Sequence, residues 1–143
     1  MALEDRVAAL ARAPLFRDVE LPQLRLLAFS AQERDFENGW CVAREGAKDA
    51  PAYLVIQGTL DIAGQEAGAG VLINAPGALA GVALRAAVTA KTDARLLVID
   101  RALVARLITE YPAMGRAMMR AAGADLRQLA GGIRAQLRMA AQR

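Results

Sequence analysis

Apolar residues recur every three or four positions near both ends of the chain, a spacing that indicates amphipathic helices. The segment 3–12 places its leucines and its valine at this spacing, and Pro14 follows it. Pro22 is suited to the first position of a helix, and the leucines after it continue the helical spacing. The pattern therefore predicts two short N-terminal helices within residues 1–30.

Residues 33–100 have a different pattern, in which eight glycines separate short apolar runs. Many short strands divided by turn signals are typical of a β-sandwich or barrel. No helical segment separates the strands, which disfavours a doubly wound α/β fold. Pro76 and Gly77 are expected to form one of the turns. The predicted strands lie in the runs "AYLVIQG", "TLDIAG", "GVLINAPG" and "ARLLVID".

Helix is predicted again after Asp100, which suits the N-cap of a helix that ends before Pro112. In residues 113–142 apolar side chains recur at heptad spacing. Such a seam favours pairing with the same helix of a second copy, and packing on its own domain is the alternative. The predicted dimer seam consists of Met119, Ala122, Leu126, Leu129, Ile133 and Leu137.

The composition excludes several kinds of catalytic site. The 143 residues include no histidine and a single cysteine, Cys41. The chain therefore cannot supply a Ser-His-Asp triad, a Cys-His pair or a zinc site of cysteines and histidines. No carboxylate pair stands out among the 15 acidic residues. We expect no catalytic residue, no metal site and no enzyme activity. Cys41 and its neighbour Trp40 fall in a predicted strand, where both are expected to be buried.

Charge is divided unevenly along the chain. Residues 101–143 contain eight arginines and two acidic residues, whereas residues 1–100 contain ten basic and thirteen acidic residues. We interpret the basic part as a solvated helix face, with an acidic partner as the alternative. Nucleic acid is not an expected partner, because domains dedicated to it are usually far more basic.

The sequence also carries no signal for export or for membrane insertion. Glu4 and Asp5 stand where a signal peptide would be basic. The uncharged stretch 67–84 contains four glycines and a proline, so turns between strands explain it better than a membrane span. A cytoplasmic protein is expected.

The ordered set of motifs resembles the cyclic-nucleotide-binding domain of the catabolite activator protein and its relatives. The "APLF" element and the helix after it look like the opening of that family. Residues 42–62, "VAREGAKDAPAYLVIQGTLDI", are similar to the family's glycine turn, "YLVxxG" strand and alternating strand. Residues 91–112 resemble its last strand and the helix that follows. The resemblance covers nearly the whole chain.

The resemblance implies a mainly β fold with flanking helices, in which a β-roll of the double-stranded β-helix or jelly-roll kind follows N-terminal helices and precedes a long C-terminal helix. A single domain is expected over residues 1–143, with N-terminal helices in 1–30, the β-roll in 33–100 and C-terminal helices in 101–142.

In that family a phosphate-binding cassette follows the "PG" turn, and it holds a glycine, a glutamate for the ribose and an arginine for the cyclic phosphate. Gly81 and Arg85 match the glycine and the arginine. Val82 stands at the glutamate position and cannot accept a hydrogen bond, and only three residues separate Gly81 from Arg85. The resemblance thus implies a vestigial, shortened cassette made of Gly81, Val82, Ala83, Arg85, Ala86 and Ala87.

These observations predict a non-catalytic regulatory or sensor module that acts as a dimer on a partner protein and does not bind cAMP or cGMP in the usual way. No cofactor is expected, although a cyclic nucleotide remains possible. One alternative is a genuine cyclic-nucleotide receptor with an atypical cassette. Another is the effector-domain fragment of a transcription regulator, because the chain ends at Arg143, before any helix-turn-helix domain.

Overall fold

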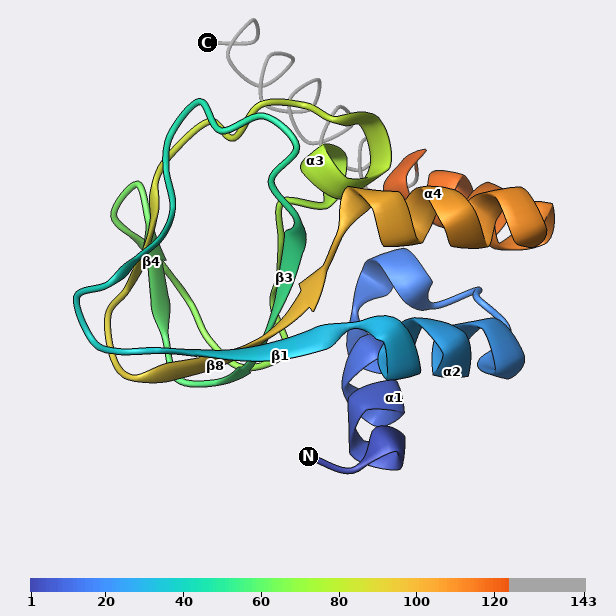
Figure 1. Cartoon of the computed structure of the whole chain (residues 1–143), viewed down its shortest axis with the longest axis horizontal. Coiled ribbons are helices and arrows are strands. Elements are labelled where there is room, and N and C mark those ends of the chain that lie inside the picture. The colour runs from blue at the N-terminus through green and yellow to red at the C-terminus, as the bar shows by residue number, and fades with distance from the viewer. Residues whose placement is uncertain (124–143) are drawn as a thin grey trace, which may run out of the picture.

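The computed structural model of the chain describes residues 1–123, and its β-roll lies beside a group of helices (Figure 1). The N-terminal part contains α1 (Leu3–Arg12), a single 3-10 turn η1 (Pro14–Phe16) and α2 (Leu21–Ser30). The bounds of α1 and α2 confirm the two helices predicted from apolar spacing. Among residues 1–123, no helix is long and apolar enough to cross a membrane.

Helix α1 packs on α2 and is joined to its end by Arg6. The Arg6 guanidinium donates to the carbonyl oxygens of Ala28 (3.2 Å) and Ala31 (3.1 Å). Ala28 lies in the last turn of α2 and Ala31 is its C-cap, where the helix end leaves acceptors unpaired and its dipole favours a positive charge. The arrangement fixes the two N-terminal helices as one unit.

The β-roll is built from two antiparallel sheets of four strands each among the described residues, with the orders β1-β8-β3-β6 and β2-β7-β4-β5. The central strands β3 and β8 pair with each other in the first sheet, and β4 and β7 pair in the second. The strands are β1 (Gln32–Phe36), β2 (Cys41–Ala43), β3 (Ala52–Gln57), β4 (Leu60–Ile62), β5 (Gln65–Ala67), β6 (Leu72–Ile73), β7 (Val88–Ala90) and β8 (Ala94–Ile99).

Strand β3 is buried on both faces, as its run of apolar residues predicts. Tyr53 and Val55 point between the two sheets and join the core of the roll. Leu54 points the other way and joins the core shared with the helices. The first sheet therefore has the second sheet on one side and the helices on the other, which is the mainly β fold with flanking helices that the motifs implied.

The C-terminal part described here consists of α4 (Arg101–Glu110) and a helical segment over residues 112–123. One face of segment 112–123 packs on the protein's own core through Met114, Ala117, Met118 and Ala121. Of the predicted dimer seam, Met119 is 65% exposed on another face and Ala122 is partly buried against the core. The remaining seam residues, Leu126, Leu129, Ile133 and Leu137, lie outside the described residues.

The expected turn at Pro76 and Gly77 is wrong, because both residues lie in a short helix, α3 (Ala75–Ala80). Proline stands in the first helical turn, which its fixed φ favours. Asn74 precedes the helix with φ 63°, and its side-chain amide donates to the carbonyls of Ala50 and Pro51 at 3.1 Å each. These two hydrogen bonds fix the start of α3. The uncharged stretch 67–84 therefore consists of strand, helix and loop.

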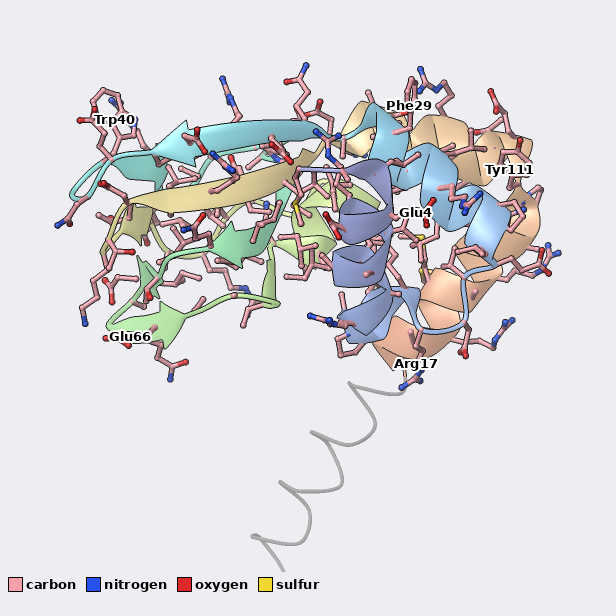
Figure 2. The ribbon with its side chains drawn as sticks, turned by 90° about the horizontal axis from the view of Figure 1, so that it is seen from below. Glu4, Arg17, Phe29, Trp40, Glu66 and Tyr111 are labelled. Atoms are coloured by element: carbon pink, nitrogen blue, oxygen red, sulfur yellow. The ribbon has the colours of Figure 1, made fainter. Side chains whose placement is uncertain are left out.

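The expected burial of Trp40 and Cys41 is also wrong. Trp40 is 61% exposed and Cys41 is exposed. The reason is topological, since β2 is a three-residue strand at the edge of the second sheet and its pairing with β7 is irregular. Figure 2 shows Trp40 at the end of the roll that lies away from the helices. Phe36, by contrast, is partly buried against the core of the roll.

Candidate functional site

The candidate site is the cassette segment, residues 81–87, which connects α3 to β7 without forming helix or strand. It runs across the top of the roll beside the loop that precedes β3 (Figure 1). Two backbone hydrogen bonds hold it there: Gly46 N–H donates to the Leu84 carbonyl at 2.7 Å, and Leu84 N–H donates to the Ala47 carbonyl at 3.0 Å. Between Gly81 and Arg85 the segment forms neither helix nor strand.

Leu84 is the residue of this segment that points into the protein. It is 8% exposed and belongs to the apolar cluster between the two sheets, together with Leu60, Val88 and Leu96. The motifs of the sequence do not single out Leu84, although it is the largest apolar residue between two alanine-rich stretches. That size was the available signal, because a lone leucine among alanines is a natural core anchor.

The predicted cassette residues do not converge on a pocket. Arg85 is exposed, and it makes no salt bridge to a carboxylate of residues 1–123. Val82 is 42% exposed, Ala83 and Ala87 are exposed, and Ala86 is partly buried. Arg85 is thus available to solvent anions, whereas its neighbour Leu84 fills the interior.

Gly81 is the one cassette residue whose type is required by its place. It ends α3 with φ 66°, a left-handed conformation that suits the residue after a helix. A side chain there would also collide with the guanidinium of Arg101. That guanidinium donates to Asp49 Oδ1 at 2.8 Å. The pair is exposed, so it contributes at most about 1 kcal/mol.

The sequence gives no sign of the contact between Arg101 and Asp49, because these residues lie far from the cassette in the sequence and meet only through the fold. Arg101 is the first residue of α4, so the contact joins the cassette glycine to the start of the C-terminal helices. Asp49 forms a salt bridge with Arg101. This salt bridge joins two parts of the protein itself, so no ligand is needed to explain the two charges.

The interior of the roll is apolar. Among residues 1–123 no charged residue is buried, and Tyr53 is the residue of the roll's core that carries a polar group. Burial raises the pKa of Tyr53 above its usual value. A cyclic phosphate buried here would lose its hydration without gaining charged partners, which is costly. Within the same residues, no three side chains of the metal-binding types come together.

Known structures with this architecture include proteins from bacteria and from a eukaryotic parasite. A cyclic nucleotide-binding-like protein from Brucella abortus has TM-score 0.67 and 24% identity over 73% of this chain and 98% of its own. The N-terminal domain of a transcriptional regulator from Streptomyces coelicolor has TM-score 0.77 and 24% identity over 87% of this chain and 94% of its own.

The regulatory domain of Toxoplasma gondii PKA, solved with cAMP, has TM-score 0.67 and 23% identity over 73% of this chain and 44% of its own. No family model and no curated protein matches the sequence. The likeness in structure, together with the two packed sheets and flanking helices, confirms the predicted architecture. The chain has the β-roll fold of cyclic nucleotide-binding-like regulatory domains.

Proposed function

We propose that the chain is a non-catalytic regulatory module whose β-roll does not bind cAMP or cGMP in the usual way. The observation that supports this most is the position of Leu84, which fills the space between the sheets next to the cassette segment. The segment that resembles a ligand loop therefore contributes to the protein's own core.

A nucleotide gripped by this segment would need partners that the segment lacks. Val82 offers no acceptor for a ribose hydroxyl, and Arg85 lies on the outside. A nucleotide that took the place of Leu84 between the sheets would drive this leucine out of the core, and withdrawing a buried leucine costs about 1.5–3 kcal/mol. Without new polar contacts, this loss has no compensation.

Thermal-shift titration with cAMP, cGMP and non-cyclic nucleotides tests the proposal. A ligand present at a hundred times its Kd stabilises a folded protein by about 2.7 kcal/mol. We expect no such stabilisation by any of these nucleotides. A saturable shift that disappears in Arg85→Ala would instead support a genuine receptor with an atypical cassette. The exposed Arg85 is the observation that keeps this second candidate open.

We further propose that the module acts as a homodimer in the cytoplasm. The heptad of Met119, Ala122, Leu126, Leu129, Ile133 and Leu137 supports the dimer, and the exposed Met119 leaves the start of this seam free for contact. Sedimentation velocity provides the test. Ile133→Asp should produce a folded monomer, whereas Gln128→Asp, which is not one of the predicted seam positions, should leave the dimer intact. A dimer that survives Ile133→Asp would contradict the seam.

The likeness to an N-terminal domain of a transcriptional regulator from Streptomyces coelicolor supports the reading of the chain as an effector domain. In that setting the signal would pass from the β-roll to a partner rather than to a catalytic site. The partner's docking surface is then the next element to identify.

A further inference from the structure

The helical end of the molecule carries a surface groove of about 550 Å³, distinct from the cassette segment. Three helices form it: α3, α4 and segment 112–123, and α3 packs directly on α4 (Figure 1). We call it the three-helix groove. Its walls include Leu79, Ile108, Gly115 and Met119, and its rim carries Arg116 and Arg120.

Gly115 sets the floor of the three-helix groove. A Cβ atom at this position would lie 2.8 Å from Ile108 Cγ2, closer than such carbon atoms approach each other. The missing side chain lets segment 112–123 lie against α4 at that point. One turn further along, Met119 rises from the same segment and remains 65% exposed.

The apolar walls of the three-helix groove are only partly used to hold the domain together, because Leu79 and Ile108 pack against the core from one side while Met119 remains largely exposed. Segment 112–123 already packs on the protein's core through a different face, on which Met118 and Ala121 are almost fully buried. An apolar surface left over after the core is complete marks an interaction site, and methionine is frequent at surfaces that adapt to a partner.

The rim of the three-helix groove is positively charged. Arg116 and Arg120 are one turn apart on the same side of their helix, and neither pairs with a carboxylate of residues 1–123. Residues 101–123 contain four arginines and one glutamate. Of these arginines, Arg101 is engaged by Asp49. The rim therefore favours an acidic occupant.

The shape of the three-helix groove favours a protein segment over a small molecule. Pockets for small molecules bury most of the ligand, usually 70–90% of its surface. Here the wall residue Met119 is itself largely in solvent, so a small ligand would stay wet on one side. An open apolar channel between helices matches the mode in which an amphipathic helix lies in a groove.

A second copy of the chain fits the charge of the rim poorly. Its C-terminal residues 124–143 contain four arginines and one aspartate. Seating that segment beside Arg116 and Arg120 would bring like charges together, which costs binding free energy. Among the groove residues, only Met119 belongs to the predicted dimer seam, and the walls contributed by Leu79 and Ile108 are not part of that seam.

We propose that the three-helix groove binds an acidic amphipathic helix of a partner protein, with apolar side chains one turn apart and carboxylates that face Arg116 and Arg120. This inference rests on the proposed regulatory function, for which it names the output surface. Because Leu79 lies in the helix that ends at the cassette glycine, the partner would contact the segment next to the vestigial ligand loop.

The test is selection of a phage-displayed library of helical peptides on the whole 143-residue chain, followed by affinity measurement of the selected synthetic peptides. We expect enrichment of acidic peptides with apolar residues at i and i+4. The double variant Arg116→Glu and Arg120→Glu should weaken their binding by roughly tenfold or more. Arg106→Glu, an exposed charge on α4 outside the groove, is the matched control and should change it little.

A structural readout locates the bound peptide. With methionine methyl groups labelled for NMR, the Met119 resonance should shift on peptide addition, whereas Met1, at the other end of the chain, should not. Peptides without an acidic bias, equal binding to the double variant, or no enrichment at all would overturn the proposal. So would a change of oligomeric state in the double variant, because it would place a second copy in the groove.

Failure of this inference is separable from failure of the proposed function. Nucleotide titration reports on the β-roll whether or not a peptide binds to the three-helix groove. If the chain binds cAMP and also selects acidic peptides, the proposal for the three-helix groove stands and the proposal that the cassette does not bind nucleotide fails. If the chain binds no nucleotide and selects no acidic peptide, the proposal for the β-roll stands and the proposal for the groove fails.

Discussion

Replacing Leu84 by alanine tests whether the cassette segment belongs to the core. Leu84 is 8% exposed and contacts the cluster between the sheets. The substitution removes three buried carbons at about 0.8 kcal/mol each, close to 2.5 kcal/mol before any cavity contribution. For a chain of this length, such a loss lowers the Tm by roughly 7–10 °C.

Val82→Ala is the control in the same segment. Val82 is 42% exposed and forms no part of the core cluster, so its truncation should cost less than about 1 kcal/mol. Urea denaturation followed by circular dichroism measures both variants, and an unchanged m value would show that only stability has changed. Equal, small losses for Leu84→Ala and Val82→Ala would refute the placement of Leu84 inside the roll.

Three further predictions concern the scaffold. Gly58→Ala should destabilise the protein more than Gly39→Ala. Both glycines have φ near 90°, but only at Gly58 would the new Cβ collide with the backbone just before β8. Thermal unfolding of the two variants gives the comparison. Burial raises the pKa of Tyr53 in the folded protein above about 10, its pKa in the unfolded chain. The neutral phenol therefore contributes its full stability below about pH 10, and this contribution is lost as the pH rises further. Tyr53→Phe should remove this pH-dependent loss from an alkaline unfolding curve. Cys41 should react with a thiol reagent in the native protein at a rate close to that of a free thiol, and protection until unfolding would contradict its exposure.

The sequence predicts the elements of this fold well where the signal is local. The first helix begins and ends as apolar spacing and Pro14 indicate. Strand β3 is buried on both faces as its unbroken apolar run indicates, and in β4 both Leu60 and Ile62 face the core as alternation indicates. Periodicity and punctuation by proline and glycine are properties of neighbouring residues, so a single sequence contains them.

The features that the sequence does not predict depend on contacts between distant residues. Trp40 and Cys41 are exposed because β2 lies at the edge of its sheet, and strand order is not visible in the strand itself. The side chain of Asn74 anchors the start of α3 by hydrogen bonds to carbonyls more than twenty residues away. Residues 75–80 therefore form a helix where a turn is expected from the sequence. Proline inside the start and glycine at the end of α3 were nevertheless readable signals.

The candidate site shows the same division. The loss of the glutamate at Val82 and the short spacing to Arg85 are visible in the sequence, and they predict a weakened cassette. The inward position of Leu84 is not, because it follows from the hydrogen bonds that tie the segment to Gly46 and Ala47. The contact of Arg101 with the cassette glycine likewise exists only in the folded chain.

The most direct test of the central claim is calorimetric titration of the purified wild-type protein with cAMP and with cGMP. If Leu84 fills the roll and Arg85 lies outside it, neither nucleotide should give saturable heat at concentrations up to about 1 mM, which corresponds to a binding free energy weaker than about −4 kcal/mol. Saturable binding of one nucleotide to one site per chain, abolished by Arg85→Ala, would contradict the account and make this domain a cyclic-nucleotide receptor.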